Sequence, residues 1–368
     1  MPPKLYGGTE RIVSYLTEEL IKLGHDVTLF ASGDSVTSAK LVSCTRTALR
    51  LDPKVRDVIP YYMLMLDRVR RRSAEFDILH FHIDHLHFPL FRDMSERVLT
   101  TIHGRQDLHD SKPIYIGFDE MRLISISDSQ RIPISGANFV ATIYHGLPKS
   151  DLKPTLCPQG GYLAFLGRIA PEKGPETAIQ IARSVGIPLK IAAKIDRADE
   201  QYFREKVAPL LDQPGIQFVG EINEHQKAEF LGQALGLLFP IDWPEPFGLV
   251  MIEAMACGTP VLAFDRGSVA EIVEHGKTGI VVQSKEEAIR SLPKLLALDR
   301  GVVRREFERL FSAERMARDH VRLYQNVLKG EQNETVQTPS KWSTPVSRPL
   351  SSVTPDLAST AASSHCFP

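Results

Sequence analysis

The sequence lacks several features that would assign it to a specialised class of protein. No apolar run is long enough to span a bilayer, and the first residues do not form the basic and apolar segments of a signal peptide. Only four cysteines occur, and their spacing fits neither a metal site nor a disulfide framework: Cys44, Cys157, Cys257 and Cys366. We therefore expect a cytoplasmic protein in a reducing compartment.

The sequence also has almost no net charge. Its formal net charge is −1, which argues against a dedicated nucleic-acid surface. The one basic run, Arg68–Arg72, falls on an expected helix and is interpreted as a solvated face, with peripheral membrane contact as an unsupported alternative. A hydrophobic fraction of 43% in 368 residues is typical of a globular protein with two domains of ordinary size.

The most informative stretch runs from Phe239 to Asp265. The apolar run Leu235–Ile241 predicts a strand buried on both faces of a parallel sheet. A proline-rich turn follows, a helix begins near Phe247, and Gly258 with Pro260 predicts its end. Such a helix start directly after a parallel strand is a seat for a phosphate, because its first N–H groups lack partners.

Two carboxylates flank this seat, eight residues apart. Glu245 precedes the helix, Gly248 falls in its first turn, and Glu253 lies about two turns further on. They could contact hydroxyl groups on either side of a bound phosphate. From spacing alone, a dipole-stabilising acid and a solvated helix acid remain an equal alternative.

The stretch from Glu245 to Val282 resembles a known family. Glu245-Pro-Phe-Gly-Leu-Val-Met-Ile-Glu253 is similar to the Glu-x7-Glu signature of retaining, nucleotide-sugar-dependent glycosyltransferases of family 4. Gly267 to Val273 and Gly276 to Val282 fit the helix and strand that follow it in that family. The resemblance covers almost the whole chain, and it implies the GT-B fold, in which two Rossmann-like parallel-sheet domains face one another across a cleft.

The resemblance implies a donor-binding site made of residues from several segments. Arg168 and Lys173 lie in Phe-Leu-Gly-Arg-Ile-Ala-Pro-Glu-Lys-Gly, which resembles the family's diphosphate-binding segment; without it they would be surface charges. Glu253 would hold the ribose, and Glu245 with the backbone of Phe247, Gly248 and Leu249 the donor sugar. Lys194 is a further candidate contact for the donor.

The N-terminal residues are expected to complete this site. Gly7-Gly8-Thr9 precedes a predicted helix, with Thr9 as its cap, and Gly8 resembles the family's glycine loop near the donor. Without the resemblance, the Gly7-Gly8 pair predicts only a tight turn. The strand that precedes this loop in the family is missing, so two strand edges should be left without a partner. Either the natural chain starts further upstream, or this is a truncated copy.

Histidines cluster at the ends of two predicted strands. His80, His82, His85 and His87 surround Asp84, but no further acid or cysteine completes a cage, so no metal is expected. Thr-Ile-His103-Gly is similar to the family segment whose histidine lies beside the transferred sugar, which implies a catalytic role for His103 and Glu245. His145 stands where the family more often has asparagine.

The expected domain limits follow from linker signals and composition. We predict an N-terminal domain at 1–148, a linker at 149–160, a nucleotide-sugar-binding domain at 161–310, a helix crossing back at 311–330, and a disordered Ser/Thr/Pro-rich tail at 331–368. Near the C-terminus we expect helices from Lys285 to Leu298 and from Arg304 to Leu328.

The implied reaction is transfer of a sugar from a nucleotide diphosphate sugar, with a UDP-sugar as the favoured donor, to a hydroxyl acceptor with retention. No cofactor is expected, and the absence of Asp-x-Asp from the sequence predicts that no metal is needed. Two alternatives remain: an epimerase or phosphorylase on the same frame, and a truncated protein that binds nucleotide sugar without catalysis. A dehydrogenase is disfavoured because no Gly-x-Gly-x-x-Gly is present.

Overall fold

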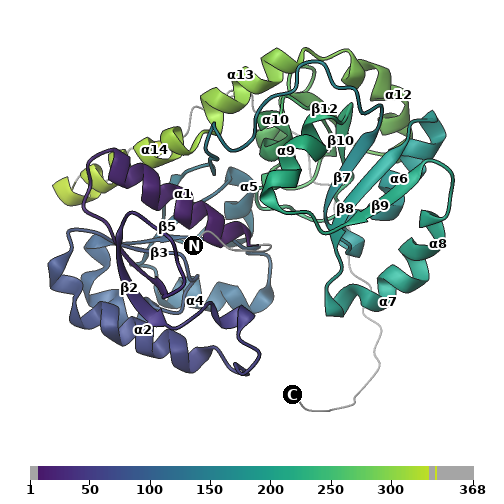
Figure 1. Cartoon of the computed structure of the whole chain (residues 1–368). Helices are drawn as coiled ribbons and strands as arrows, with labels where there is room; N and C mark the ends of the chain where they lie inside the picture. Colours follow the sequence, from purple (N-terminus) through teal and green to yellow (C-terminus); the bar gives the residue numbers. More distant parts are fainter. Residues whose placement is uncertain (1–6, 331–335, 338–368) are drawn as a thin grey trace, which may run out of the picture. The chain divides into compact units, whose positions relative to one another are not determined.

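The computed structural model describes residues 7–330 and 336–337 of the chain. These residues form three groups of parallel strands (Figure 1). A separate pair consists of β1 (Thr28–Ser32) and β2 (Lys40–Thr45). A five-stranded sheet has the order β13-β6-β5-β4-β3, and its strands are β3 (Leu79–Phe81), β4 (Val98–Thr101), β5 (Arg122–Ser125), β6 (Phe139–Thr142) and β13 (Val336–Gln337).

The second half of the chain builds a six-stranded parallel sheet with the order β12-β11-β10-β7-β8-β9. Its strands are β7 (Leu163–Arg168), β8 (Leu189–Lys194), β9 (Ile216–Gly220), β10 (Gly236–Phe239), β11 (Val261–Phe264) and β12 (Gly279–Val282). Every residue of β10 and β11 is buried, so both faces of these strands are covered, as the uninterrupted apolar sequence predicts.

Helices connect the strands. They are α1 (Gly8–Lys22), α2 (Ile59–Arg71), α3 (Phe88–Phe91), α4 (Lys112–Gly117), α5 (Asp128–Arg131), α6 (Pro175–Val185), α7 (Glu200–Tyr202), α8 (Ala208–Leu211), α9 (Glu224–Gly232), α10 (Leu249–Ala256), α11 (Val269–Ile272), α12 (Lys285–Leu296), α13 (Arg300–Leu310) and α14 (Ala313–Lys329). The regular alternation of parallel strands and helices is the Rossmann-like pattern that the sequence predicts.

Alternate residues of each strand pack on opposite faces of its sheet. In β4, Leu99 packs with Ile12 and Leu16 of α1, whereas Val98 packs with Leu66 and Val69 of α2. The six-stranded sheet is covered in the same way, by α9 and α10 on one face and by α6 and α12 on the other. Both sheets are therefore central layers between helices.

Four local predictions were wrong. Strand β2 was missed, because its residues are only partly buried and carry no clear alternation. Thr9 lies inside α1, and Gly7 occupies the N-cap. Gly248 is likewise the N-cap of α10 and not a first-turn residue. The single helix expected from Arg304 to Leu328 is divided into α13 and α14.

The break between α13 and α14 is made by a distant segment. The backbone N–H of Leu147 donates to the carbonyl of Phe311 at 2.9 Å, and the N–H of Ala313 donates to the carbonyl of Leu147 at 2.9 Å. Ser312 then caps α14 through its hydroxyl, which accepts from the N–H of Arg315 at 3.4 Å. These hydrogen bonds replace the helical ones that a continuous helix would have made.

Of the predicted disordered tail, only Val336 and Gln337 belong to the described residues, where they pair with β6. The rest of 331–368 lies outside the described part, as do residues 1–6. The helix α14 contacts α1, and Tyr324 on it hydrogen-bonds His80 of β3 at 2.7 Å. No described helix has the length and apolar content needed to cross a membrane.

Gly146→Ala tests the crossing at Leu147. A Cβ on Gly146 would lie 2.3 Å from the carbonyl oxygen of Ser312, so the change should destabilise the protein by about 1–3 kcal/mol. Gly136→Ala is the matched control, because nothing lies within 4 Å of a Cβ there. Urea unfolding of both variants measures the difference; equal stability of the two would contradict this packing.

Candidate active site

The turn between β10 and α10 forms the centre of the candidate site. Gly248 has φ 79°, in the left-handed region that favours glycine, and a Cβ there would lie 2.6 Å from Cε of Met251. Within the described residues no side chain caps α10, and the N–H of Met251 donates to the carbonyl of Gly248 at 3.0 Å. The N–H groups of Leu249 and Val250, at the start of this eight-residue helix, therefore keep their capacity to bind an anion.

The N-terminus of α1 lies against the start of α10. A Cβ on Gly8 would lie 3.2 Å from Cδ1 of Leu249, so these two candidate donor-binding residues are neighbours. They are 241 positions apart in the sequence, and only the fold brings them together. The glycine at position 8 lets the two helix starts approach closely.

Glu245 lies on one side of this turn and is paired with a lysine. Its Oε2 accepts from Nζ of Lys173 at 2.6 Å and from Nε1 of Trp243 at 2.9 Å. The lysine also lies 4.8 Å from the centre of the Trp243 ring. Ser268 donates its N–H to the carbonyl of Glu245 at 2.9 Å, which fixes the backbone as well. The structure thus joins two of the predicted site residues in one ion pair.

The loop that carries Lys173 packs directly on the end of β10. Glu172 accepts the N–H of Asp242 at 2.9 Å through its carbonyl oxygen. A Cβ on Gly174, which has φ 67°, would lie 2.2 Å from the carbonyl oxygen of Pro240. This close approach explains why glycine occurs at the end of the loop.

Arg168 has a different set of partners. It lies at the end of β7 and pairs with Glu172 at 3.0 Å, Asp199 at 3.4 Å and Asp196 at 3.5 Å. Lys194, the further candidate, pairs with Asp196 at 2.6 Å. Arg168 therefore reaches the loop of Lys173 only through Glu172, four residues further along the chain.

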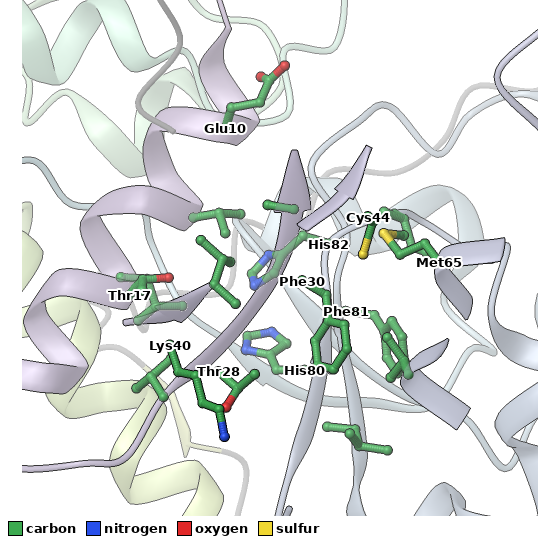
Figure 2. Close-up of a pocket in the computed structure, with 18 of the residues that line it drawn as sticks. Glu10, Thr17, Thr28, Phe30, Lys40, Cys44, Met65, His80, Phe81 and His82 are labelled. Carbon is green, nitrogen blue, oxygen red and sulfur yellow. The ribbon is translucent and has the colours of Figure 1, made fainter. Parts of the chain in front are cut away.

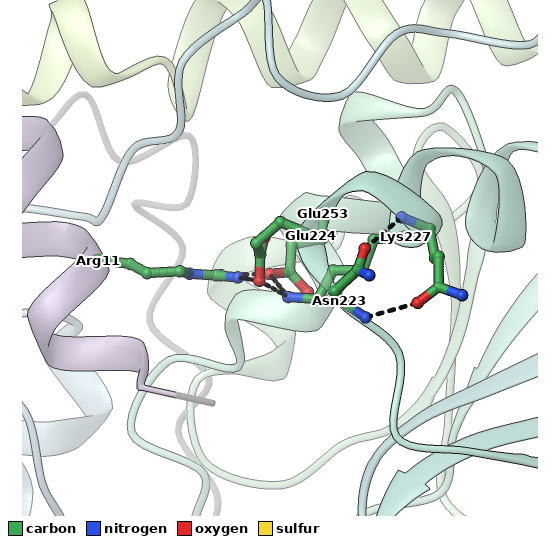
Figure 3. A network of polar contacts seen from close by, with 6 residues as sticks. Arg11, Asn223, Glu224, Lys227 and Glu253 are labelled. Atoms are coloured by element: carbon green, nitrogen blue, oxygen red, sulfur yellow. Dashed lines mark hydrogen bonds and ion pairs between the residues drawn. The ribbon is translucent and has the colours of Figure 1, made fainter. Parts of the chain in front are cut away.

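Glu253 is buried inside a network of charges (Figure 3). Its side chain is 5% exposed, and its Oε1 contacts both Nη2 of Arg11 and Nζ of Lys227, the latter at 2.9 Å. Glu224 on α9 pairs with the same two cations. The network joins α1, α9 and α10.

This network decides the ionisation of Glu253. Burial alone would raise the pKa of Glu253, but Lys227 and Arg11 outweigh that effect and lower the pKa to about 2. Burial would likewise lower the pKa of Arg11, and the facing Glu253 and Glu224 raise it instead. Both groups are therefore charged at neutral pH.

Histidine rings connect the end of β4 with the turn before α10. His103 Nε2 lies 2.9 Å from Nδ1 of His82, and the His103 ring stacks on His145 with centroids 5.2 Å apart. His145 in turn meets the Phe247 ring edge-on at 4.8 Å. The structure thus links His103 to Phe247 through a residue that the sequence interpretation did not assign to the site.

His103 is uncharged at neutral pH. Burial, with a smaller contribution from the nearby His320, lowers its pKa to about 3. Its Nδ1 is buried without a hydrogen-bond partner among the described residues. A neutral imidazole in this state can donate or accept one further hydrogen bond.

Sequence reasoning missed three residues that shape the site. Arg11 and Lys227 carry no motif that would pair them with Glu253. Glu271 was noted only as part of the family match, yet its carboxylate accepts the N–H groups of Asp128 and Ser129, both at 2.7 Å. It also accepts from the hydroxyl of Tyr144 at 3.1 Å, and burial raises its pKa.

The described residues contain no group of three or more His, Cys, Asp or Glu side chains arranged to hold a metal ion. His80 and His82 stack with ring centroids 4.2 Å apart. His80 uses both ring nitrogens, bonding Tyr324 at 2.7 Å and Thr101 at 2.8 Å. These contacts assign His80 to the packing between β3, β4 and α14.

Comparison with known proteins agrees with this architecture. Residues 154–310 match the family "Glycosyl transferases group 1", and residues 6–128 match "Glycosyltransferase Family 4". We therefore place the chain among the glycosyltransferases of family 4, which confirms the resemblance found in the sequence. The fold is that of the GT-B glycosyltransferases.

The individual relatives share limited sequence identity with this chain. The D-inositol 3-phosphate glycosyltransferase of Jonesia denitrificans is 33% identical over 142 residues, which is 34% of this chain and 32% of that protein. The match thus spans about a third of that relative's length. Sucrose-phosphate synthase from Thermosynechococcus elongatus has a TM-score of 0.71 at 21% identity and covers 88% of this chain and 94% of its own. HepE from Anabaena, solved with UDP and glucose, has a TM-score of 0.67 at 15% identity and covers 88% and 97%.

The Glu253 network makes the free energy of unfolding depend on pH at acidic values. Because the folded pKa of about 2 lies below the ordinary 4.5, ionised Glu253 stabilises the fold above pH 4.5, and this contribution is lost as the pH falls towards 2. The loss should be on the order of 3 kcal/mol.

Glu253→Gln should lower stability at pH 7, because Arg11 and Lys227 lose their partner, but its stability should fall less between pH 4.5 and 2.5. Urea unfolding across this range measures both effects. Glu96→Gln, at an exposed position, is the control and should follow the unmodified protein. An acid dependence that is the same in Glu253→Gln and the control would show that the network does not hold Glu253 ionised.

Proposed function

We propose that this protein transfers a sugar from a nucleotide diphosphate sugar to a hydroxyl acceptor, with retention at the anomeric carbon. The observation that carries the proposal is the N-terminus of α10, which no described side chain caps, with a buried carboxylate on each side, Glu245 and Glu253. An anion fits the helix start, while acids suit the hydroxyl groups of the ribose and of the transferred sugar.

The leaving diphosphate would be bound by α10 and two cations. Lys173 lies beside the turn, where it forms an ion pair with Glu245. Arg168 lies at the start of the same loop. Positive groups held before the reaction stabilise charge as it develops on the leaving group, without reorganising at that moment. Both cations pair with carboxylates in this structure. A bound diphosphate would therefore compete with these carboxylates for the two cations.

Glu253 would bind the ribose through its second oxygen. Arg11 and Lys227 contact Oε1, so we assign Oε2 to the ribose hydroxyls. Because the pKa is about 2, the carboxylate is ionised and accepts hydrogen bonds across the physiological pH range. Glu245 and the backbone of Phe247 to Leu249 would hold the sugar itself, with Gly8 close to Leu249.

His103 would contact the transferred sugar as a neutral donor. Its Nδ1 has no hydrogen-bond partner in the described part of the chain, and its ring is connected to Phe247 through His145. A neutral imidazole orients a sugar hydroxyl without adding a charge beside the reacting carbon. Since Nδ1 is enclosed, its neighbours must move before the sugar reaches it, and closure of the two domains around the bound donor would then exclude water.

For the donor we favour a UDP-sugar, because a solved protein of the same fold holds UDP and glucose. We also infer a reducing, cytoplasmic location, which is supported by the free thiols of the described cysteines Cys44, Cys157 and Cys257. The domain limits 1–148, 149–160, 161–310 and 311–330 are likewise our proposal, with the donor held mainly by the second domain. The acceptor hydroxyl would approach from the side of the first domain.

Donor binding can be tested by thermal shift with UDP-glucose, GDP-mannose and ADP-glucose. At 100 times its Kd, a true donor should stabilise the protein by about 2.7 kcal/mol. The double variant Arg168→Ala/Lys173→Ala should weaken binding at least tenfold, since each lost charge-assisted hydrogen bond is worth about 1.5–3 kcal/mol.

The matched control is Arg204→Ala/Lys206→Ala, which also removes two cations but at exposed positions on another part of the same domain. It should bind the donor like the unmodified protein. Equal donor shifts in the two double variants would overturn the assignment of the diphosphate to this site.

Metal independence is a separate prediction. Because two protein cations and a helix N-terminus are assigned to the diphosphate, turnover with the best donor should be unchanged in excess EDTA. Release of free nucleotide with and without added Mg²⁺ measures this. Loss of turnover in EDTA, restored by Mg²⁺, would mean that a metal shares the charge of the diphosphate.

A further inference from the structure

Two histidines meet at the carboxyl edge of the five-stranded sheet. His82 directly follows β3, and His103 lies two residues beyond β4. The two strands are parallel neighbours, with Phe81 opposite Thr100, so their carboxyl ends lie side by side. Nδ1 of His82 lies 2.9 Å from Nε2 of His103, which is a hydrogen-bond distance. The fold thus brings one ring nitrogen of each residue into direct contact.

A single proton lies between the two rings. Burial, with a smaller contribution from the neighbouring His80, lowers the pKa of His82 well below its ordinary value, and burial acts in the same way on His103. No described carboxylate forms an ion pair with either ring that would offset this effect. Each ring is therefore neutral and carries one N–H, which can stand on either of its nitrogens.

The contact allows two arrangements of these protons. In the first, His82 donates from Nδ1, while His103 accepts at Nε2 and carries its own proton on Nδ1. In the second, His103 donates from Nε2, and its Nδ1 carries no proton. Only the first arrangement gives His103 the N–H on Nδ1 with which it would donate to the transferred sugar. The choice of donor within the pair thus decides what His103 can offer to a ligand.

Other contacts fix the position of His103 but leave its proton free to choose. The side-chain amide of Gln130 donates to the backbone carbonyls on either side of His103, at 3.0 and 2.7 Å. The ring of His145 stacks on that of His103 with an angle of 17° between the two planes. Among the described residues, His82 is the one that hydrogen-bonds the His103 ring. The tautomer of His103 therefore depends on His82.

His82 is itself supported by a ring that cannot turn freely. The rings of His80 and His82 have centroids 4.2 Å apart, and Figure 2 shows them next to each other. His80 uses both of its ring nitrogens, bonding Tyr324 at 2.7 Å and Thr101 at 2.8 Å. Rotation of the His80 ring would break both hydrogen bonds. His80 thus gives His82 a fixed neighbour on the side away from its contact with His103.

We propose that His82 is a positioning residue of the candidate active site, which donates from Nδ1 to His103 and so holds His103 as the tautomer with its proton on Nδ1. His82 has this role only under the proposed function, because the sugar is what His103 would bind through that N–H. The histidines near the end of β3, for which the described residues offer no metal site, thereby acquire a use. His80 supports His82, and His82 sets the proton of His103.

The tautomer can be observed directly in the ligand-free protein. Protonated and unprotonated ring nitrogens have well-separated chemical shifts in NMR spectra of histidine-labelled protein, and loss of a signal in His103→Gln identifies His103. We expect the proton of His103 on Nδ1. In His82→Phe, which keeps a flat ring but has no N–H, a second tautomer with the proton on Nε2 should appear. A proton on Nε2 in the unmodified protein, or an unchanged tautomer in His82→Phe, would overturn the proposal.

Binding measures the consequence for the sugar. The donor that binds best among UDP-glucose, GDP-mannose and ADP-glucose is compared with its own free nucleoside diphosphate by calorimetry. His82→Phe should weaken binding of the sugar nucleotide about threefold to tenfold, because one neutral hydrogen bond is lost. The Kd of the free nucleoside diphosphate should not change. An equal loss for both ligands would show a merely structural role for His82, and no loss for either would show no role.

A conservative variant and a matched control complete the test. The amide of His82→Asn can donate from the place of Nδ1, so this variant should restore the proton on Nδ1 of His103 and bind the sugar nucleotide within about twofold of the unmodified protein. Behaviour like that of His82→Phe would show that the ring of His82, and not its N–H, matters. His25→Phe makes the same change at an exposed position beyond the C-terminal end of α1 and should alter neither the tautomer nor either Kd.

Failure of the proposed function gives a different result. If none of these donors binds to the unmodified protein, transfer from a nucleotide sugar is excluded, and the role of His82 towards the sugar falls with it. The spectrum of the ligand-free protein still decides whether His82 sets the tautomer of His103. If a donor binds and only the tautomer or the sugar-dependent loss in His82→Phe is missing, the proposed function stands and the role of His82 is overturned.

Discussion

The charge on Glu253 is the constraint around which the candidate site is built. A carboxylate that is 5% exposed cannot remain ionised unless cations contact it, because removal from water costs several kcal/mol. Arg11 supplies one contact from the first helix of the chain and Lys227 supplies the other from α9. The fold must therefore bring α1, α9 and α10 to one point, and this requirement also places Gly8 beside Leu249.

The other cations of the site are also paired with carboxylates. Lys173 is neutralised by Glu245, and Arg168 by three acids of its own domain. The site thus contains its cations already positioned and already paired. Such a site keeps its geometry before any ligand arrives, and a diphosphate competes with carboxylates for cations that are in place.

Much of this was predictable from local sequence. The buried strand Leu235–Ile241 and the helix start near Gly248 follow from apolar runs and glycines, whereas the proximity of Lys173 to that helix was implied only by the resemblance to the family. The pairing of Arg11 with Glu253 was not predictable, because the two residues are 242 positions apart and Arg11 has the pattern of an ordinary helical arginine. The division of the last helix was missed for a similar reason. Its cause is the backbone of Leu147, which lies more than 160 positions away from Phe311 and Ser312.

That crossing of Leu147 has a mechanical consequence. The chain passes between the two sheets twice, once after β6 and once between α13 and α14, and the two passages are fastened to each other by a pair of backbone hydrogen bonds. Because Leu147 both donates and accepts, neither passage can slide along the other without breaking both hydrogen bonds, so the two connections are held in one fixed register.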